Sequence, residues 1–164
     1  MAQLYLKFEG KGYTADLDGV VERKNYDKTI EVDSFGFGAS HQGGLPKLSG
    51  SDTSLQGNAS PGEIIISKIA GQESPGLLTA CLKGTIIGKA TLTMDGSSDD
   101  NVATPIVTYV IEPVVVKSMS QSGGSGGGEA SIGEQVALAF DKLTVTHVPS
   151  KKIATYQQST ATTK

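Results

Sequence analysis

The feature that most constrains the fold is a two-residue alternation of apolar and polar side chains, which is the period of a β-strand. Leu4, Leu6 and Phe8 share one parity near the start of the chain, and Tyr5 and Lys7 share the other. Successive side chains on a strand point to opposite faces, so this pattern predicts a strand with one buried face. Frequent glycine, serine and threonine, with only 5% aromatic residues, also favour β-strands joined by tight turns.

Three later apolar segments change parity part of the way along. The changes fall at Asp33–Ser34, Glu112–Pro113 and Asp141–Lys142. Because regular pairing preserves parity, each change predicts a bulge or a bend. Three bent strands predict a sheet that curls on itself, as a small barrel or a tightly curved sandwich.

One short helix is expected in "ESPGLLTACLKG", residues 73–84. Ser74 is suited to the N-cap, Pro75 to the first turn, and Gly84 to the left-handed residue that ends a helix. The apolar face of this helix is Leu77, Leu78, Cys81 and Leu82. A helix of this length needs tertiary packing, so this face is expected to be buried against the sheet.

Two stretches show no periodicity. Residues 38–62 predict an extended loop, which is too long for a simple connection. Its leucines, at positions 45, 48 and 55, are separated by polar residues and glycine. We expect Leu45, Leu48 and Leu55 to contact a neighbouring subunit, although the loop folding back over its own core is an alternative.

The second such stretch is glycine-rich and lies at residues 122–128. It is either a linker between domains or the tip of a hairpin. Segments of similar β character flank it, and too few residues follow to make another domain. The hairpin tip is favoured, and residues 1–164 are expected to form a single domain.

Composition narrows the class of function. With a net charge of −3, no strong attraction to nucleic acid is expected. The only cysteine is Cys81, which excludes an internal disulfide. The first residues show no basic stretch followed by an apolar one, so no signal peptide is expected. No run of about 18 apolar residues is present, so membrane insertion is not expected either.

No motif predicts an enzyme, a metal site or a cofactor. His41 and His147 lack cysteine or carboxylate companions at metal-ligand spacing. "DGSSDDN" from Asp95 places oxygens like a calcium loop, but Asp100 stands where that loop needs glycine. "GTIIGKA" from Gly84 is one residue too short for a phosphate loop. Cys81, on an apolar helix face, is expected to be a structural thiol.

Six segments and their order along the chain carry a resemblance to a known family. They are "LYLKFEG", "KTIEVDSFGFG", "ISKIAGQESPGLLTACLKG", "KATLTM", "IVTYVIEPVVVKSMSQSGGSGG" and "EQVALAFDKLTVTHVP". In this order they resemble the Hcp family, the tube proteins of bacterial type VI secretion systems. The family's helix has Ser-Pro at its start and Ala-Cys near its end, which match Ser74–Pro75 and Ala80–Cys81. The resemblance covers nearly the whole chain, and is weakest at residues 38–60 and after about residue 150.

Two segments depart from the family pattern. One is "GKGYTADLDGVVERKN", where the family has a polar-acidic stretch, and the other is the C-terminal "SKKIATYQQSTATTK", which lacks a glycine-rich ending. The departures concern the surface contacts and leave the expected fold unchanged. The resemblance implies a mainly β fold: a small β-barrel of two curved antiparallel sheets with one short helix on its flank, similar to phage tail tubes. It also implies structural roles for Ser74, Pro75, Leu78 and Cys81.

The resemblance further implies a structural protein without enzymatic activity. Six copies would form a ring, and rings would stack into a hollow tube that carries effectors in its lumen. A contractile sheath would drive the tube, tipped by a VgrG-like spike protein, from the cytoplasm into the medium or a target cell. The alternatives are a phage or phage-like tail tube protein and a ring-shaped effector chaperone. Neighbouring genes would distinguish a phage tail tube protein from a secretion tube protein. Protection of cargo in cells that form no tubes would identify an effector chaperone.

Overall fold

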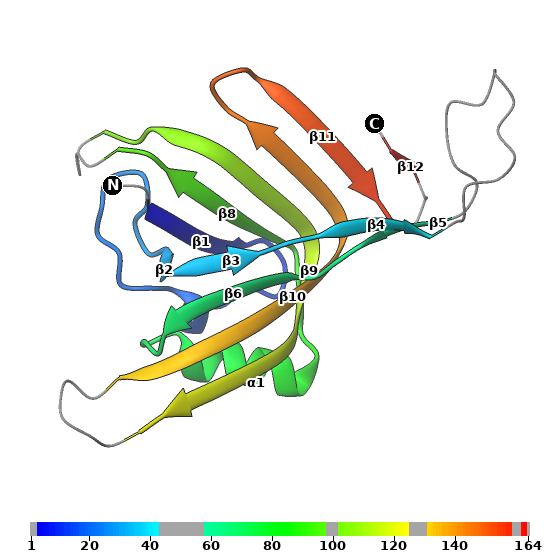
Figure 1. Ribbon diagram of the computed structural model, residues 1–164. Helices are drawn as coiled ribbons and strands as arrows, with labels where there is room; N and C mark the ends of the chain where they lie inside the picture. The colour runs from blue at the N-terminus through cyan, green and yellow to red at the C-terminus, as the bar shows by residue number, and fades with distance from the viewer. Residues whose placement is uncertain (1–2, 43–57, 98–101, 125–130, 159–161, 164) are drawn as a thin grey trace, which may run out of the picture.

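The computed structural model describes residues 3–42, 58–97, 102–124, 131–158 and 162–163 (Figure 1). The strands are β1 (Gln3–Glu9), β2 (Ile30–Val32), β3 (Ser34–Gly36), β4 (Ala39–Gln42), β5 (Asn58–Pro61), β6 (Ile64–Ile69), β7 (Ile86–Ile87), β8 (Lys89–Asp95), β9 (Pro105–Gly123), β10 (Ile132–His147), β11 (Lys152–Gln157) and β12 (Thr162–Thr163). The helices are η1, a 3-10 helix (Ala15–Leu17), and α1 (Ser74–Lys83).

Most strands belong to one antiparallel sheet, which has ten strands within the described residues. Its main order is β12-β11-β10-β9-β8-β1-β2, with β6 beside β10, β3 beside β6 and β7 beside β9. The sheet curls strongly but stays open (Figure 1). Two of its edge strands, β2 and β3, follow each other directly in the chain, because β2 pairs with β1 while β3 pairs with β6.

The mainly β fold with one short helix is thus confirmed. The expected two sheets are instead one continuous sheet, with a separate two-stranded sheet made of β4 and β5. The reason lies in the length of β9 and β10, which have 19 and 16 residues. These strands run through both halves of the curled structure, so the backbone ladder is not interrupted between them.

The predicted bend at Asp33 is present. β2 ends at Val32 and β3 begins at Ser34. Between them, the Asp33 amide donates a hydrogen bond to the Ser67 carbonyl oxygen at 2.9 Å. The chain therefore changes its pairing partner from β1 to β6 at this residue without leaving a gap in backbone hydrogen bonding.

At the two other parity changes the bulge alternative is wrong, and a cis peptide bond joins Glu112 to Pro113 at one of them. Glu112 lies opposite Lys142 in an unshifted part of the β9–β10 ladder, so neither strand has an extra residue there. β9 and β10 each switch which side of the strand is buried, and they do so at neighbouring positions. Their pairing therefore keeps the same register across the switch. The shift in register lies farther along, between the Ala137–Ser118 and Leu138–Val116 pairs.

The core fills the inside of the curl. The largest fully buried side chains are Leu6, Ile30, Ile64, Ile66, Leu77, Ile87, Leu92, Ile111, Val114, Val116, Val136 and Leu138. They come from β1, β2, β6, α1, β7, β8, β9 and β10, so strands distant in sequence share one apolar interior. Burial of this surface is the main force that holds the curl together.

Helix α1 lies where the sequence predicts it and packs against β9. It ends at Gly84, whose φ of 62° is the left-handed conformation expected there. Its first turn differs from the prediction, because Glu73 precedes the helix and Ser74 is its first residue. The residue expected at the N-cap thus lies one position farther into the helix.

The predicted burial of the whole apolar helix face is wrong. Leu77 is fully buried, whereas Leu78 is 43% exposed and Leu82 79% exposed. Cys81 is half-buried and packs against the core, and Pro75 is exposed. The helix turns one narrow side to the sheet and another to η1, where Gly76 approaches the Asp16 carbonyl. These two contacts leave Leu78 and Leu82 uncovered.

The predicted loop at residues 38–62 is partly ordered as strands. β4 and β5 pair with each other and lie beyond the ends of β3 and β6 (Figure 1). Sequence periodicity missed them because residues such as Ala39 and Ser40 are exposed, so no apolar face is needed. Leu45, Leu48 and Leu55 lie outside the described residues. At the glycine-rich stretch, Gly123 and Ile132 pair across antiparallel β9 and β10.

Candidate assembly surfaces

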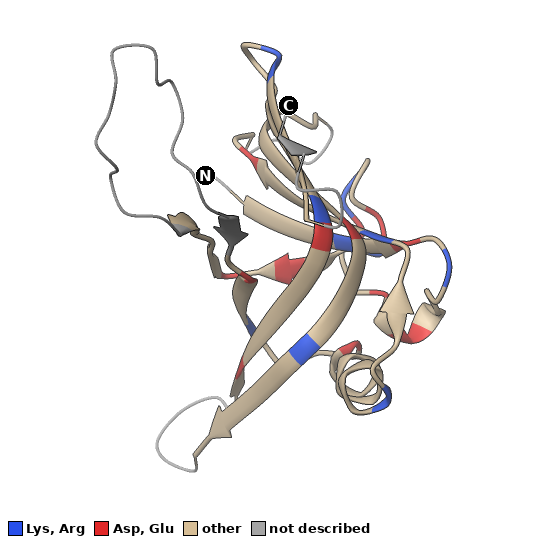
Figure 2. Cartoon of the chain, turned by 90° about the vertical axis from the view of Figure 1, so that its right-hand side faces the viewer, with Lys and Arg blue, Asp and Glu red and all other residues tan. Residues whose placement is uncertain are grey.

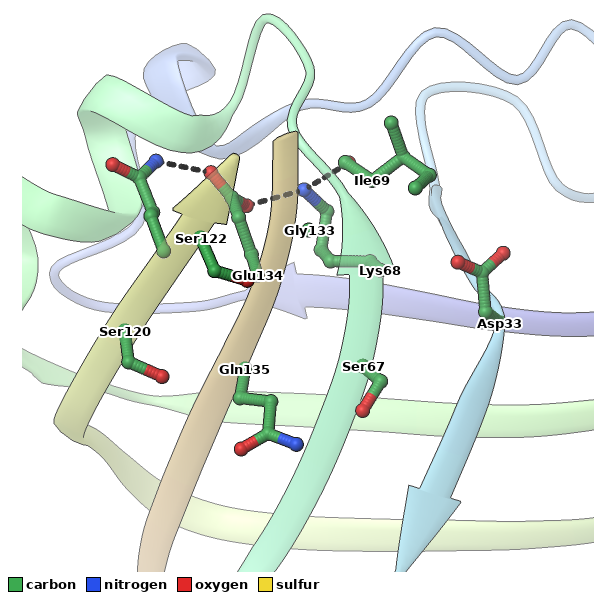
Figure 3. A pocket seen from close by; sticks show the side chains of 10 residues that line it. Asp33, Ser67, Lys68, Ile69, Ser120, Ser122, Gly133, Glu134 and Gln135 are labelled. Carbon is green, nitrogen blue, oxygen red and sulfur yellow. Dashed lines mark hydrogen bonds and ion pairs between the residues drawn. The ribbon is translucent and has the colours of Figure 1, made fainter. Parts of the chain in front are cut away.

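A buried lysine lies where β6 approaches the start of α1. The Lys68 ammonium is within 2.6 Å of Glu73 Oε1 and 2.7 Å of Glu134 Oε2, and it donates to the Ile69 carbonyl at 2.8 Å. All three charged side chains are at least 95% buried. Figure 3 shows Lys68 and Glu134 reaching toward each other between their strands. We call Lys68, Glu73, Ser74, Gln121 and Glu134 the Lys68 cluster.

Several donors keep Glu134 ionised. Burial raises the pKa of this carboxyl, but hydrogen bonds from Lys68, Ser74 and Gln121 and the positive charge of Lys68 bring the pKa below its ordinary value. The Ser74 hydroxyl also accepts the Gly71 amide at 2.9 Å. Ser74 therefore joins the first turn of α1 to β10. The cluster ties together the ends of β6, β9 and β10 and the beginning of the helix.

A second buried polar group centres on Arg23, the only arginine. Its guanidinium donates to Gln3 Oε1 at 2.9 Å, to Tyr5 Oη at 3.1 Å and to the Val102 carbonyl at 3.0 Å. It also pairs with Asp95 at 3.4 Å. Tyr5 stacks on Tyr26 with ring centroids 4.4 Å apart. Arg23 thus links residues 19–29 and the described part of the β8–β9 connection to the first half of β1.

Asp95, considered above as the start of a calcium loop, is fully buried in this Arg23 group. It accepts hydrogen bonds from the Ser97 amide at 2.7 Å, the Thr104 amide at 2.9 Å and the Tyr26 hydroxyl at 2.5 Å. Burial raises its pKa, but these hydrogen bonds and the nearby Arg23 lower it below the ordinary value overall. The Asp95 carboxylate therefore joins Ser97, Thr104 and Tyr26 in the folded chain.

The two histidines lie apart. His41 is exposed on β4, and the His147 Nδ1 atom lies 2.8 Å from the Ser150 hydroxyl at the end of β10. Within the described ranges, no three histidine, cysteine or carboxylate side chains gather as metal ligands would. No helix in the described part of the chain is long and apolar enough to cross a membrane.

One face of the sheet carries small polar side chains. On β3, β6, β10 and β9, the register aligns Ser34, Ser67, Gln135 and Ser120 across all four strands. Figure 3 shows Ser67, Gln135 and Ser120 side by side on this face, where an open depression of about 510 Å³ lies. We call this surface the serine face. The opposite face of the same strands buries Ile64, Ile66, Val136 and Leu138 in the core.

The four-stranded section that forms the serine face has an unpaired strand edge on each side within the described residues. Within the described residues, β3 pairs only with β6, and Lys117–Gly123 of β9 pair only with β10. The two edges lie on opposite sides of the order β3-β6-β10-β9. Unpaired strand edges offer amide and carbonyl groups to another chain, so they are natural sites of association. Figure 2 shows that β9 and β10 carry few charged side chains that would oppose such contact.

Lys68 and Glu134 are the main residues that the sequence interpretation missed. A signal for them exists, because Lys68 shares its parity with Ile64 and Ile66, and Glu134 shares its parity with Val136. A charge on the core parity of a strand predicts a buried ion pair. The predicted structural residues have separate surroundings: Ser74 is in the cluster, Cys81 borders the core, and Pro75 and Leu78 are exposed.

The buried charges have structural partners, and the polar face and open strand edges suit repeated association. These features define a structural assembly protein built on a curled antiparallel sheet. The family model of the type VI secretion system effector Hcp matches residues 5–147. The chain therefore belongs to the Hcp family of type VI secretion proteins.

Solved structures show the same fold. A structure described as a type six secretion system protein is 21% identical, with 100% of both chains covered and a TM-score of 0.79. Hcp1 from Salmonella typhimurium is 22% identical over 99% of each chain, with a TM-score of 0.76. The secreted protein Hcp3 from Pseudomonas aeruginosa is 16% identical, with 96% of this chain and 98% of the other covered and a TM-score of 0.67. No curated protein matches the sequence.

Proposed function

We propose that this protein is the structural subunit of the inner tube of a type VI secretion machine, assembled as rings of six that stack into a hollow tube. The observation that carries the proposal is the family match over residues 5–147. Residues 1–164 act as one structural unit in this proposal. The role is structural, without enzymatic activity, and the buried polar groups described above serve stability.

The two open strand edges suggest how a ring closes. β3 of one subunit adds to the Lys117–Gly123 edge of β9 in the next, and this contact repeats around the ring. Such an interface is heterologous, since it joins two different surfaces, and a heterologous contact closes into a ring when its rotation fits. Backbone pairing then continues from subunit to subunit.

The serine face lines the lumen in this arrangement. Hydroxyl, amide and small side chains give a wetted wall without strong charge, which suits passage of varied proteins. Ser34, Ser67, Ser120 and Gln135 would thus face cargo. Effectors are the proposed cargo, and the surface chemistry of each effector determines how well it fits this polar wall.

The strands β4 and β5 form the base of an arm that contacts the neighbouring ring or subunit. Leu45, Leu48 and Leu55 are the proposed contact residues of this arm. Replacing residues 43–57 by a short Gly-Ser turn tests the role. We expect soluble, folded protein that has lost tube formation and secretion, and normal tubes from this variant would contradict the assignment.

Light scattering after size-exclusion chromatography, combined with negative-stain imaging, tests the main proposal. We expect a mass of six chains and ring-shaped particles at micromolar concentration and neutral pH, without added metal or nucleotide. A stable interface of this kind should bury about 1,000 Å² or more. A monomer at tens of micromolar would contradict the proposal.

The remaining partners are a contractile sheath outside the tube and a VgrG-like spike at its tip. The protein stays in the cytoplasm before firing and then reaches the medium or a target cell. Comparing culture supernatants with and without the sheath gene tests this route. Secretion that is unchanged without the sheath would argue against it.

A further inference from the structure

Two large apolar side chains are exposed on the same side of α1. Leu78 is 43% exposed and Leu82 is 79% exposed. Residues four apart on a helix lie above one another, so Ser74, Leu78 and Leu82 form one row. The first member of this row is buried in the Lys68 cluster, whereas the two leucines are not covered by their own subunit. We call Leu78 and Leu82 the leucine row.

The helix that carries the leucine row packs against β9. At its start, α1 is tied to the strand by Ser74, whose partner Glu134 also accepts Gln121 of β9 at 2.5 Å. Just after the helix, Ile86 pairs with Val115 of β9. The helix therefore runs beside residues 115–121 of this strand, and Figure 1 shows α1 behind the lower parts of β9 and β10.

The other sides of the helix are occupied. Leu77 and Ala80 face the core. Gly76 faces η1 so closely that a Cβ atom there would lie 2.2 Å from the Asp16 carbonyl oxygen. Gly76 lies well away from Leu78 and Leu82 around the helix, so the leucine row points away from η1. Ser74, the first member of the same row, hydrogen-bonds Glu134, which also accepts from Gln121 on the unpaired Lys117–Gly123 edge of β9.

We propose that the leucine row is part of the subunit–subunit interface and is covered by a second copy of this chain when that copy pairs with β9. Two independent features select this occupant. Among the described residues the β9 edge has no further strand beside it, and the same subunit offers β3, which pairs there only with β6, on the opposite side of the four-stranded section. A strand of the neighbouring subunit that pairs with β9 passes beside α1. The neighbouring subunit then covers Leu78 and Leu82 with an apolar contact.

The inference rests on the proposed ring, and it assigns α1 a part in holding neighbouring subunits together. The Lys68 cluster supports this part, because it fixes the start of the helix to β6, β9 and β10 before a neighbour arrives. A preordered surface loses less entropy on association. The row itself carries no charge, which suits an apolar contact that becomes buried.

Thiol protection tests the proposal directly. In a Cys81→Ser background, Leu82→Cys introduces a single thiol on the row, and Thr79→Cys introduces one on the exposed helix surface outside the row. Maleimide labelling is followed for assembled protein and for protein diluted until the rings dissociate. We expect the Leu82→Cys thiol to react at least about tenfold more slowly in the ring, with less than a twofold change for Thr79→Cys.

Assembly itself gives a second measurement. Leu82→Asp and Leu78→Asp should raise the concentration needed for half-assembly about tenfold or more, since burying a leucine is worth at least that factor. Thr79→Asp, with the same added charge, should leave it nearly unchanged. Far-UV circular dichroism checks the fold of each variant. If the aspartate variants do not fold, the thiol measurement alone tests the proposal.

The outcomes are distinct. Intact rings in which the Leu82→Cys and Thr79→Cys thiols react equally fast would overturn this inference and leave the tube proposal standing. The row would then be open to another partner on the outside of the ring. A wild-type chain that never forms rings would overturn both.

Discussion

Replacing Lys68 by methionine should strongly destabilise the protein. Methionine has a similar length and fits an apolar environment, so the substitution removes the charge with little change in volume. The Glu73 and Glu134 carboxylates would remain, each with a side chain no more than 5% exposed. Neither would have the ammonium that now lies within 2.7 Å of both.

The size of the effect follows from these contacts. Removing one partner of a buried ion pair typically costs about 3–5 kcal/mol, because the other charge is left without compensation. A proton can relieve one of the two remaining charges, and at pH 7 protonating a glutamate of ordinary pKa costs about 3.7 kcal/mol. Both routes lead to a loss of about 3–5 kcal/mol in the free energy of unfolding.

Denaturant unfolding at pH 7, at one fixed protein concentration, measures this loss. The concentration must be fixed because assembly itself stabilises the folded subunit. Lys142→Met is the matched control: Lys142 lies 3.7 Å from Glu112, outside the proposed subunit contact, and 40% of its side chain is exposed, so little change is expected. Adding Glu134→Gln to Lys68→Met should recover part of the loss. A loss below about 1 kcal/mol for Lys68→Met would refute the reasoning.

Three further predictions follow from burial and charge. Leu77→Ala should cost about 2–5 kcal/mol in denaturant unfolding, whereas Leu78→Ala should cost clearly less in dissociated subunits; equal losses would contradict the burial pattern. Gly76→Ala should lower the melting temperature despite the better helix propensity of alanine, since the new methyl group would meet the Asp16 carbonyl, and a rise would show that η1 can move. The pKa of Glu134 is lowered on folding, so its stabilisation is present above about pH 4.3 and is lost as the pH falls through the folded pKa; unfolding at pH 5 and pH 3 should therefore show a larger drop for wild type than for Glu134→Gln.

Local sequence patterns were sufficient for the elements whose causes are local. Alternation at Leu4, Leu6 and Phe8 predicts β1, and the structure buries Leu6 and Phe8, but the predicted single buried face is wrong because Tyr5 on the opposite face is buried as well. The Ser-Pro start and the left-handed Gly84 predict the extent of α1 to within a residue. The parity change at Asp33 predicts a real bend, because the chain there has one strand partner on each side of the break.

Patterns of this kind could not show which apolar residues remain uncovered. Leu77 and Leu78 are equally apolar and adjacent in sequence, yet only Leu77 is buried. The difference arises from the direction in which the sheet and η1 approach the helix, which is a long-range property. The same holds for Glu112 and Lys142, where two strands change their buried face together and keep their register.

The sequence by itself thus determined the β character of the chain, its single α-helix and its resemblance to the Hcp family. These signals depend on residues that are close together in the sequence. Only the tertiary structure brought Lys68, Glu73 and Glu134 together from β6, the residue before α1, and β10. It alone left Leu78 and Leu82 exposed and, within the described residues, the Lys117–Gly123 edge of β9 unpaired on one side. Contacts between distant segments depend on how the whole sheet curls, and this curvature is a collective result of packing around one core.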